Sequence, residues 1–174
     1  MHEQVVVEQV YSASDIAARI ADLGQSIRDA AGTKQIFLLG ILKGASVFMA
    51  DLMRAIDGEV GYGFIDVVHD MADTQVATAM EIDFLHWIDI AGKNVYILKD
   101  VVSTGVIETY LMTQLRQKKP ADLELVALLD RPGMRTVELK VDFSLFEAED
   151  GPFAGYGLES NGLFGNLPYI GRVK

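Results

Sequence analysis

Short apolar runs recur along the chain and are separated by polar segments. The runs at 36–41, 95–98 and 123–129 are almost wholly apolar, which is typical of strands buried on both faces of a parallel sheet. Weaker strand signals lie at 60–68, 80–84 and 141–146. We therefore expect strands in these six segments.

Helical periodicity lies between several of these runs. One apolar stripe is formed by Ile16, Ile20, Leu23 and Ile27, which recur every three or four positions. Ser12 or Ser14 can cap this helix, and Gly32 can end it. We expect helices from there to about residue 31, at 47–56 and at 104–117. The segment 69–79 is expected to be a mobile loop, and the glycine- and aromatic-rich tail, 147–174, to be loop-like.

The alternation of helices with apolar strands predicts an α/β fold, with a parallel sheet covered on both faces. Ligands of such sheets bind at the carboxyl ends of the strands. Two polar turns, 42–46 and 100–105, lie at predicted strand ends. In the second, Ser103-Thr104-Gly105 precedes a helix, so its N–H groups and hydroxyls can surround an anion at the positive end of that helix. This turn therefore suits a phosphate group.

Composition narrows the class of protein. Half of the 174 residues are hydrophobic, which suffices for one domain, 1–174, with a full core. The absence of cysteine excludes disulfides and thiolate metal sites. A formal net charge of −10 argues against nucleic acid as a partner, and an anionic ligand must be held by local amides and cations. With no membrane-spanning run and no visible signal peptide, we expect a cytoplasmic protein with no membrane partner.

Five segments carry a family likeness, in order and at suitable spacing: Leu42–Ala45, Val95–Gly105, Leu128–Pro132, Gly155–Leu158 and Asn166–Gly171. Together they resemble the purine-salvage phosphoribosyltransferases of the hypoxanthine-guanine type, over nearly the whole chain from about residue 16 to 174. The resemblance implies the type I phosphoribosyltransferase fold, which is a central, mostly parallel twisted sheet flanked by helices. It also implies a small hood from the C-terminal segment, about 141–174.

The resemblance further implies an activity and its partners. Ribose 5-phosphate is transferred from phosphoribosyl pyrophosphate, with Mg²⁺, to hypoxanthine or guanine, and pyrophosphate is released. A homodimer or homotetramer is the expected assembly. Roles carried over by position are catalysis for Asp100 and Ser103; 5′-phosphate binding for Ser103, Thr104 and Gly105; pyrophosphate binding for Leu42, Lys43, Gly44 and Arg135; purine binding for Arg131, Phe153, Ala154 and Glu159; and metal binding for Asp100 and Glu159.

For two of these residues, a role without any ligand contact stays open. Lys43 can be a solvated surface lysine, and Phe153 can be an ordinary core residue. Arg131 stands where the family has a lysine, and it keeps the charge but changes the shape. The substitution of glutamate for aspartate at residue 159 is mild.

Other positions depart from the family pattern. Lys99 replaces the first of two adjacent acids, and Ser103 replaces the aspartate that faces the purine ring nitrogen; a serine takes no proton at neutral pH without a neighbouring base. Strand alternation would place Lys99 and Asp100 on opposite faces. The remaining departures are Val106 and Ile107 in place of polar phosphate ligands, Gly165 in place of an arginine, and Val68-His69-Asp70 in place of the Ser-Tyr of a closing loop.

Three hypotheses follow from this combination of retained and altered residues. The first is an active purine phosphoribosyltransferase in which Ser103 takes the catalytic position. The second is a catalytically impaired protein of the same fold that binds a purine nucleotide or phosphoribosyl pyrophosphate, as a regulator or partner subunit. The third is an oligomeric scaffold without a ligand, against which the retained Asp100, Thr104, Gly105 and Arg131 argue.

Overall fold

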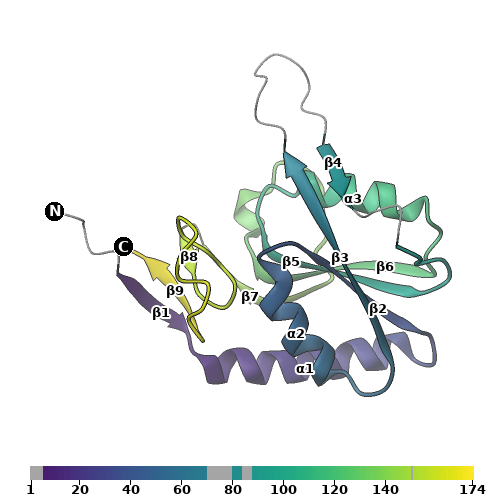
Figure 1. Cartoon of the computed structure of the whole chain (residues 1–174), viewed down its shortest axis with the longest axis horizontal. Coiled ribbons are helices and arrows are strands. Elements are labelled where there is room, and N and C mark those ends of the chain that lie inside the picture. Colours follow the sequence, from purple (N-terminus) through teal and green to yellow (C-terminus); the bar gives the residue numbers. More distant parts are fainter. Residues whose placement is uncertain (1–5, 70–79, 84–87, 150) are drawn as a thin grey trace, which may run out of the picture.

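The computed structural model describes residues 6–69, 80–83, 88–149 and 151–174. Its elements alternate between strands and helices (Figure 1), as the sequence pattern predicts. In chain order they are β1 (Val7–Tyr11), α1 (Ala13–Ala31), β2 (Ile36–Ile41), α2 (Ala45–Ala55), β3 (Val60–His69), β4 (Met80–Asp83), β5 (Asn94–Val102), α3 (Val106–Arg116), β6 (Asp122–Asp130), a 3₁₀ turn (Pro132–Met134), β7 (Phe143–Glu147), β8 (Phe153–Ala154) and β9 (Ile170–Val173).

The larger sheet has the strand order β4-β3-β2-β5-β6-β7. The five strands from β3 to β7 in this order are mutually parallel, and β4 pairs antiparallel with β3. The predicted α/β class and the parallel sheet are confirmed. Parallel pairing aligns the carboxyl ends of β2 and β5, because Gly40 lies opposite Leu98. The turns that follow these strands therefore leave the sheet at the same edge.

Helices cover both faces of this sheet. Helices α1 and α2 contribute to one apolar cluster with Leu38, Tyr96 and Leu98, whereas α3 packs with Val95 and Ile97 on the other face. Helix α1 begins with a capping box, in which Ser12 accepts from the Asp15 amide and Asp15 accepts from the Ser12 amide. The sequence correctly identified its cap and its apolar stripe.

A second, three-stranded antiparallel sheet forms the hood, in the order β1-β9-β8. It lies at the end of the molecule where the two described ends of the chain meet (Figure 1), and Val7 pairs with Val173. Its strands β8 and β9 fall within the tail expected to be loop-like, and β1 was not expected. Residues 143–147, which were assigned to the hood, pair with β6 in the larger sheet instead. The hood therefore draws on both ends of the chain.

Two strand boundaries also differ from expectation, and one bears on the site. The strand expected at 95–98 continues to Val102, so Lys99 and Asp100 belong to β5 and not to the turn. Strand β3 continues to His69, and the rest of the segment expected to be a mobile loop lies outside the described residues. Within the described ranges, no helix has the length and apolarity needed to cross a membrane.

Candidate active site

The carboxyl ends of β2 and β5 bring the Leu42–Gly44 turn against Asp100. A Cβ atom on Gly44 would lie 1.9 Å from Oδ2 of Asp100, so only glycine fits there without displacing the carboxylate. The peptide bond between Leu42 and Lys43 is cis. Two segments predicted from sequence to form one site are therefore in direct contact.

The C-terminal motif closes onto the same turn. Nζ of Lys43 lies 3.2 Å from Oε2 of Glu159, with the two side chains 79% and 40% exposed. Gly157 also approaches the turn, since a Cβ there would lie 2.8 Å from the carbonyl oxygen of Gly44. A pair this exposed adds little stability, but it locates the Lys43 ammonium beside the strand ends. Lys43 is thus solvent-exposed and paired at once.

Asp100 is paired with its neighbour Lys99. The Lys99 ammonium contacts Oδ1 of Asp100, and the same oxygen accepts a hydrogen bond from the Val101 amide at 2.8 Å. The two side chains are 18% and 21% exposed. The expectation that they face opposite sides of the strand is therefore wrong at the level of their charged groups.

Side-chain alternation breaks down at this end of β5. Tyr96 and Leu98 pack with the α1–α2 cluster, so strict alternation would place Val102 there too. Instead Val101 packs on that cluster, and Val102 packs on the α3 side. The change of face between Leu98 and Val101, together with the long flexible lysine stem, explains how the two charges meet.

Glu108, in the first turn of α3, is a buried acid that the sequence analysis missed. Burial raises the pKa of its carboxyl, whereas its own backbone amide and the nearby charges of Lys99 and Arg135 act in the opposite direction. Asp100 adds a smaller upward influence on this pKa. An acid in a first helical turn is normally solvated, so no sequence signal marked it. It places a second carboxyl near Lys99.

The predicted phosphate turn links β5 to α3. Gly105 adopts φ +84°, which favours glycine, and precedes the first helical residue. The Thr136 amide donates to the carbonyl oxygen of Thr104 at 3.1 Å, which ties this turn to the chain after β6. The N-cap residue Gly105 has no side chain, and the Val106 amide makes only a long hydrogen bond, of 3.5 Å, to Oγ1 of Thr104. The amides of this first turn can therefore turn to an anion. Exposed Val106 adds an apolar surface there, not a donor.

Arg135 fixes this turn in place. Its Nη1 donates to the carbonyl oxygens of Val102 and Ser103 at 2.9 and 2.5 Å, and its Nη2 pairs with Asp130. The guanidinium is therefore engaged with the protein's own acceptors. Its predicted contact with pyrophosphate stays a prediction.

Arg131 lies beside the other predicted catalytic residue. Its Nη1 donates to Oγ of Ser103 at 3.5 Å, which is a long hydrogen bond. Arg131 also lines a cavity of about 540 Å³ at the ends of β6 and β7. The other lining residues are Pro132, Gly133, Met134, Glu147, Ala148 and Glu149. A cavity lined by Arg131, which itself contacts Ser103, offers a cation to a flat polar heterocycle.

Phe153 and Ala154 lie in the hood strand β8. Phe153 is half-buried, packs against the larger core cluster, and has the Arg172 guanidinium 5.7 Å from its ring centroid. Ala154 is fully buried. This environment agrees with the core-packing alternative for Phe153, and its stacking on a purine stays a prediction.

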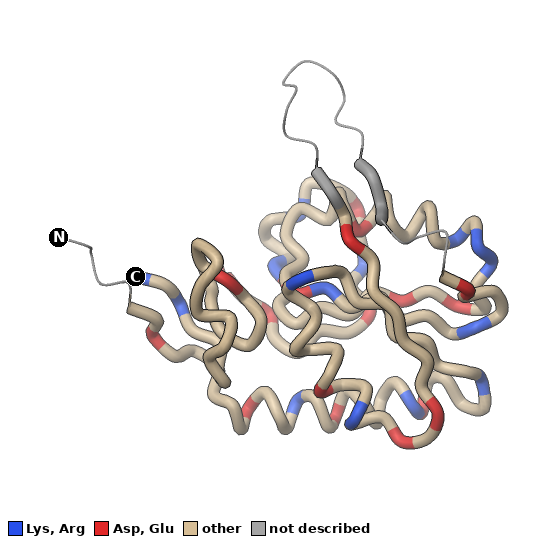
Figure 2. The backbone as a smooth tube through the Cα atoms, in the orientation of Figure 1, with Lys and Arg blue, Asp and Glu red and all other residues tan. Residues whose placement is uncertain are grey.

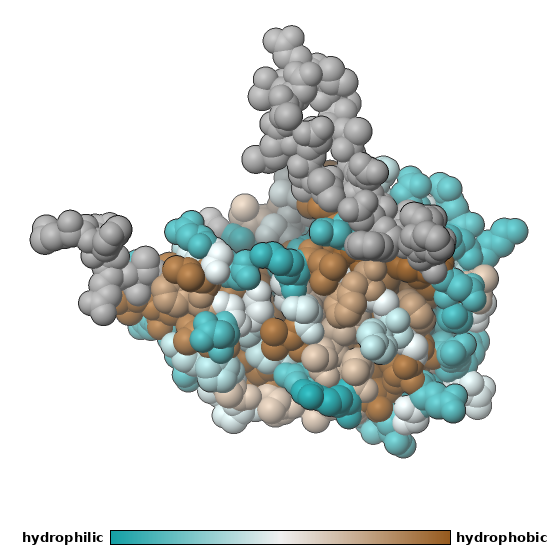
Figure 3. Space-filling model, viewed as in Figure 1, coloured by the Kyte–Doolittle hydropathy of each residue, from teal (hydrophilic) through white to brown (hydrophobic). Residues whose placement is uncertain are grey.

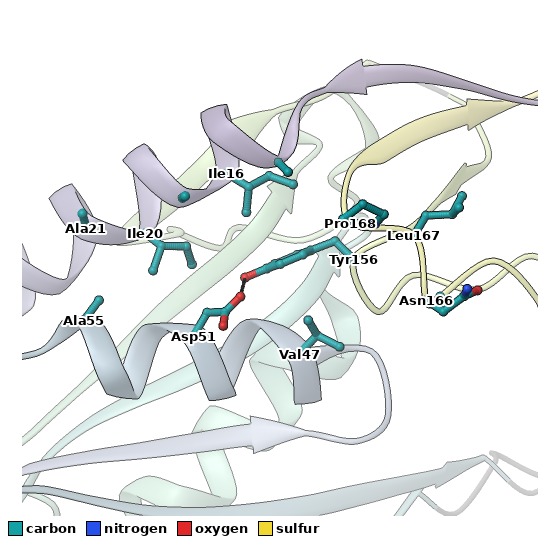
Figure 4. Close-up of a pocket in the computed structure, with 13 residues that line it drawn as sticks. Ile16, Ile20, Ala21, Val47, Asp51, Ala55, Tyr156, Asn166, Leu167 and Pro168 are labelled. Atoms are coloured by element: carbon teal, nitrogen blue, oxygen red, sulfur yellow. Dashed lines mark hydrogen bonds between the residues drawn. The ribbon is translucent and has the colours of Figure 1, made fainter.

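A second cavity, of about 490 Å³, lies between α1, α2 and the loop 165–168 (Figure 4). Its walls are mostly apolar, and the hydroxyl of Tyr156 donates to Oδ2 of Asp51 at 2.5 Å across it. Burial raises the pKa of Tyr156, and the Asp51 carboxylate raises it further. None of the residues to which a catalytic, binding or metal role was assigned lines this cavity, so we place the candidate site at the strand ends.

Comparison with known proteins shows the family and the fold of the chain. A family model described as a phosphoribosyl transferase domain matches residues 6–161. The chain is 30% identical to the hypoxanthine-guanine phosphoribosyltransferase of Bacillus subtilis (strain 168), covering 100% of this chain and 97% of that protein.

Two crystal structures give the same result. A hypoxanthine-guanine phosphoribosyltransferase from Bacillus anthracis superposes with a TM-score of 0.86 at 28% identity, covering 98% of this chain and 100% of that one. A hypoxanthine phosphoribosyltransferase from Staphylococcus aureus superposes with a TM-score of 0.85 at 30% identity, covering 96% of this chain and 91% of that one. The shared architecture includes the parallel sheet at whose edge we place the candidate site.

Proposed function

The chain belongs to the phosphoribosyltransferase family, and from that premise we propose that it is a purine-salvage enzyme. It transfers ribose 5-phosphate from phosphoribosyl pyrophosphate to hypoxanthine or guanine and releases pyrophosphate. The contact of Gly44 with Asp100 carries this proposal. It joins a turn suited to pyrophosphate to an acid suited to the ribose, at the strand edge where ligands of parallel sheets bind.

The remaining roles follow from position. The 5′-phosphate binds at Ser103, Thr104 and Gly105, where the first amides of α3 supply donors. The purine occupies the cavity beside Arg131, and its ring nitrogen faces Ser103. The ring nitrogen attacks the anomeric carbon of the ribose as the bond to pyrophosphate breaks, and the proton that the purine ring loses leaves with the pyrophosphate or passes to water. Positioning and electrostatic stabilisation supply the rate, because the Ser103 hydroxyl accepts no proton by itself.

Mg²⁺ enters with phosphoribosyl pyrophosphate as part of the substrate in this proposal. The two carboxylates expected to bind metal are each paired with a lysine, Asp100 with Lys99 and Glu159 with Lys43. Over the described ranges, no group of three or more acidic or histidine side chains is arranged to hold a metal ion. These residues therefore do not fit a resident metal held by protein carboxylates.

Nucleotide formation tests the proposal. We expect purified protein, hypoxanthine, phosphoribosyl pyrophosphate and Mg²⁺ to yield inosine monophosphate and pyrophosphate in equal amounts, measured by chromatography. No product at high enzyme concentration, with hypoxanthine or with guanine, would overturn it. Sedimentation of the same sample tests the proposed homodimer or homotetramer.

A further inference from the structure

We propose that the Lys99 ammonium takes over at the end of β5 the part that a divalent cation would play there. It binds oxygen atoms of phosphoribosyl pyrophosphate directly, so that donor binding depends little on Mg²⁺. This inference rests on the proposed function and specifies how its donor is held.

The position of Lys99 is the first argument. Its ammonium contacts Asp100, and the Asp100 carboxylate lies directly against Gly44 of the predicted pyrophosphate turn. The ammonium is therefore held one carboxylate away from the position proposed for the pyrophosphate. In the family this residue is an acid, so the substitution changes the charge by two units at the centre of the site.

The surroundings of Lys99 are the second argument. The side chain is only 18% exposed, and a cation with so little solvent needs compensating charge. Asp100 supplies it by contact, and buried Glu108 on α3 lies within electrostatic range, with Arg135 as the opposing cation. The cation is thus built into the site and is not a solvated surface group.

The chemistry of an ammonium is the third argument. It has three N–H donors, and the contact with Oδ1 of Asp100 uses one of them. Phosphate and hydroxyl oxygens of the donor are suitable acceptors for the others. A Mg²⁺ ion at the same position would face a fixed positive charge, and the adjacent carboxylate would already be neutralised. The site therefore favours one built-in cation over a bound metal.

Calorimetric titration with phosphoribosyl pyrophosphate, in EDTA and in excess MgCl₂, tests this inference. We expect the Kd of the unmodified protein to differ by less than about threefold between the two buffers, a difference worth well under the 1.4 kcal/mol of a tenfold change. The variant Lys99→Met should bind at least about tenfold more weakly in EDTA, and Lys99→Arg should retain binding there. The variant Lys99→Glu, which restores an acid, should bind well only with Mg²⁺.

A matched control lies at the other end of β5. Lys93, directly before the strand, is 21% exposed and pairs with Asp89 at 3.6 Å. The variant Lys93→Glu makes the same charge change away from the site, and its Mg²⁺ dependence should match that of the unmodified protein. If Lys99 only locks Asp100 in place, Lys99→Met will weaken binding equally in both buffers.

The outcomes separate the inference from the function. Two results would overturn the role of Lys99 and leave the proposed function standing. In one, the unmodified protein binds phosphoribosyl pyrophosphate only in MgCl₂. In the other, Lys99→Met weakens that binding equally in both buffers. Binding in neither buffer would overturn both. Since the first comparison uses the unmodified protein, a variant that fails to fold leaves the inference testable.

Discussion

At the scale of single residues, the site combines retained and altered positions. Asp100 and Gly105 occupy the places that the family likeness assigns, at the strand end and before the helix. Lys99 and Ser103 depart from the residues that the family likeness leads us to expect at this site. Both lie on or directly after β5, beside groups that form contacts with them. Their effects are therefore separable by substitution.

Replacing Ser103 by aspartate should raise the rate. The new carboxylate would lie where Oγ of Ser103 now accepts from Arg131, so a cation is already in place to hold it, and it would accept a proton that serine cannot. A positioned base typically contributes about 10²–10⁴ in rate, and we expect at least a tenfold rise in kcat with hypoxanthine. A Ser103→Asn variant, of similar size but not a base, should show no such rise. An unchanged or lower kcat for Ser103→Asp would show that residue 103 does not face the purine.

Glu108 should make stability depend on pH. Its folded pKa is raised above the ordinary value of 4.5, so the folded state holds the proton more tightly than the unfolded chain. The stabilisation that comes from binding this proton is complete below the pKa of Glu108 in the unfolded chain. It is lost as the pH rises through the pKa of Glu108 in the folded protein. Glu108→Gln should therefore raise Tm at neutral pH, and this advantage should shrink as the pH falls toward 4.5.

Thermal unfolding at several pH values measures this difference. The control is Glu138→Gln, at an exposed position. It should change Tm only slightly, and by the same amount at every pH. A Glu108→Gln variant that is less stable than the parent at neutral pH would mean that the ionised acid stabilises the fold through Lys99 and Arg135.

At the scale of elements, much of the fold follows from the sequence, and the exceptions have physical causes. Helix α1 has a local signal in its capping box, and β2 has one in its apolar run. Strand β1 lacks one, because Glu8, Gln9 and Val10 are all exposed and the strand is defined by pairing with β9. The pairing of Lys99 with Asp100 was likewise unpredictable, since it depends on a change of face within β5.

The close contact between the β2–α2 turn and β5 predicts a severe effect at Gly44. In Gly44→Ala the new methyl would overlap the Asp100 carboxylate, so the turn or the acid must move. A misplacement of about 1 Å costs roughly 10²-fold in rate, and we expect at least that loss in kcat/KM. Gly63→Ala is the control, because its Cβ would meet only side-chain atoms, of the Phe37 ring at 3.3 Å and of Leu39 at 3.9 Å. Normal activity of Gly44→Ala would place the reaction elsewhere.

Arg135 joins the ends of β5 and β6, so its removal should lower the free energy of unfolding. The variant Arg135→Ala leaves Asp130, 17% exposed, without its cation, which costs about 3–5 kcal/mol in the free energy of unfolding. Urea denaturation measures this loss. In the exposed pair of Arg54 and Asp51, Arg54→Ala should cost at most about 1 kcal/mol. Unchanged stability with weakened binding of phosphoribosyl pyrophosphate would assign Arg135 to the ligand instead.

At the scale of the whole molecule, a chain with a net charge of −10 must hold any anionic ligand by a local arrangement of amides and cations. Acidic and basic positions are interspersed along the described backbone (Figure 2), and no single basic face is needed. Apolar surface also appears on the face shown in Figure 3. Val47 and Tyr62 are among the large apolar side chains that are exposed. We therefore expect the specificity of the protein to reside at the edge of the sheet, where turns from β2, β5 and β6 meet.

A crystal structure of the protein with inosine monophosphate, pyrophosphate and Mg²⁺ is the most direct test of this arrangement. We predict pyrophosphate beside the Leu42–Gly44 turn and near Asp100, the 5′-phosphate on Ser103–Gly105, and the purine beside Arg131. Nucleotide bound instead in the apolar cavity between α1 and α2, with the strand ends unchanged, would contradict the account.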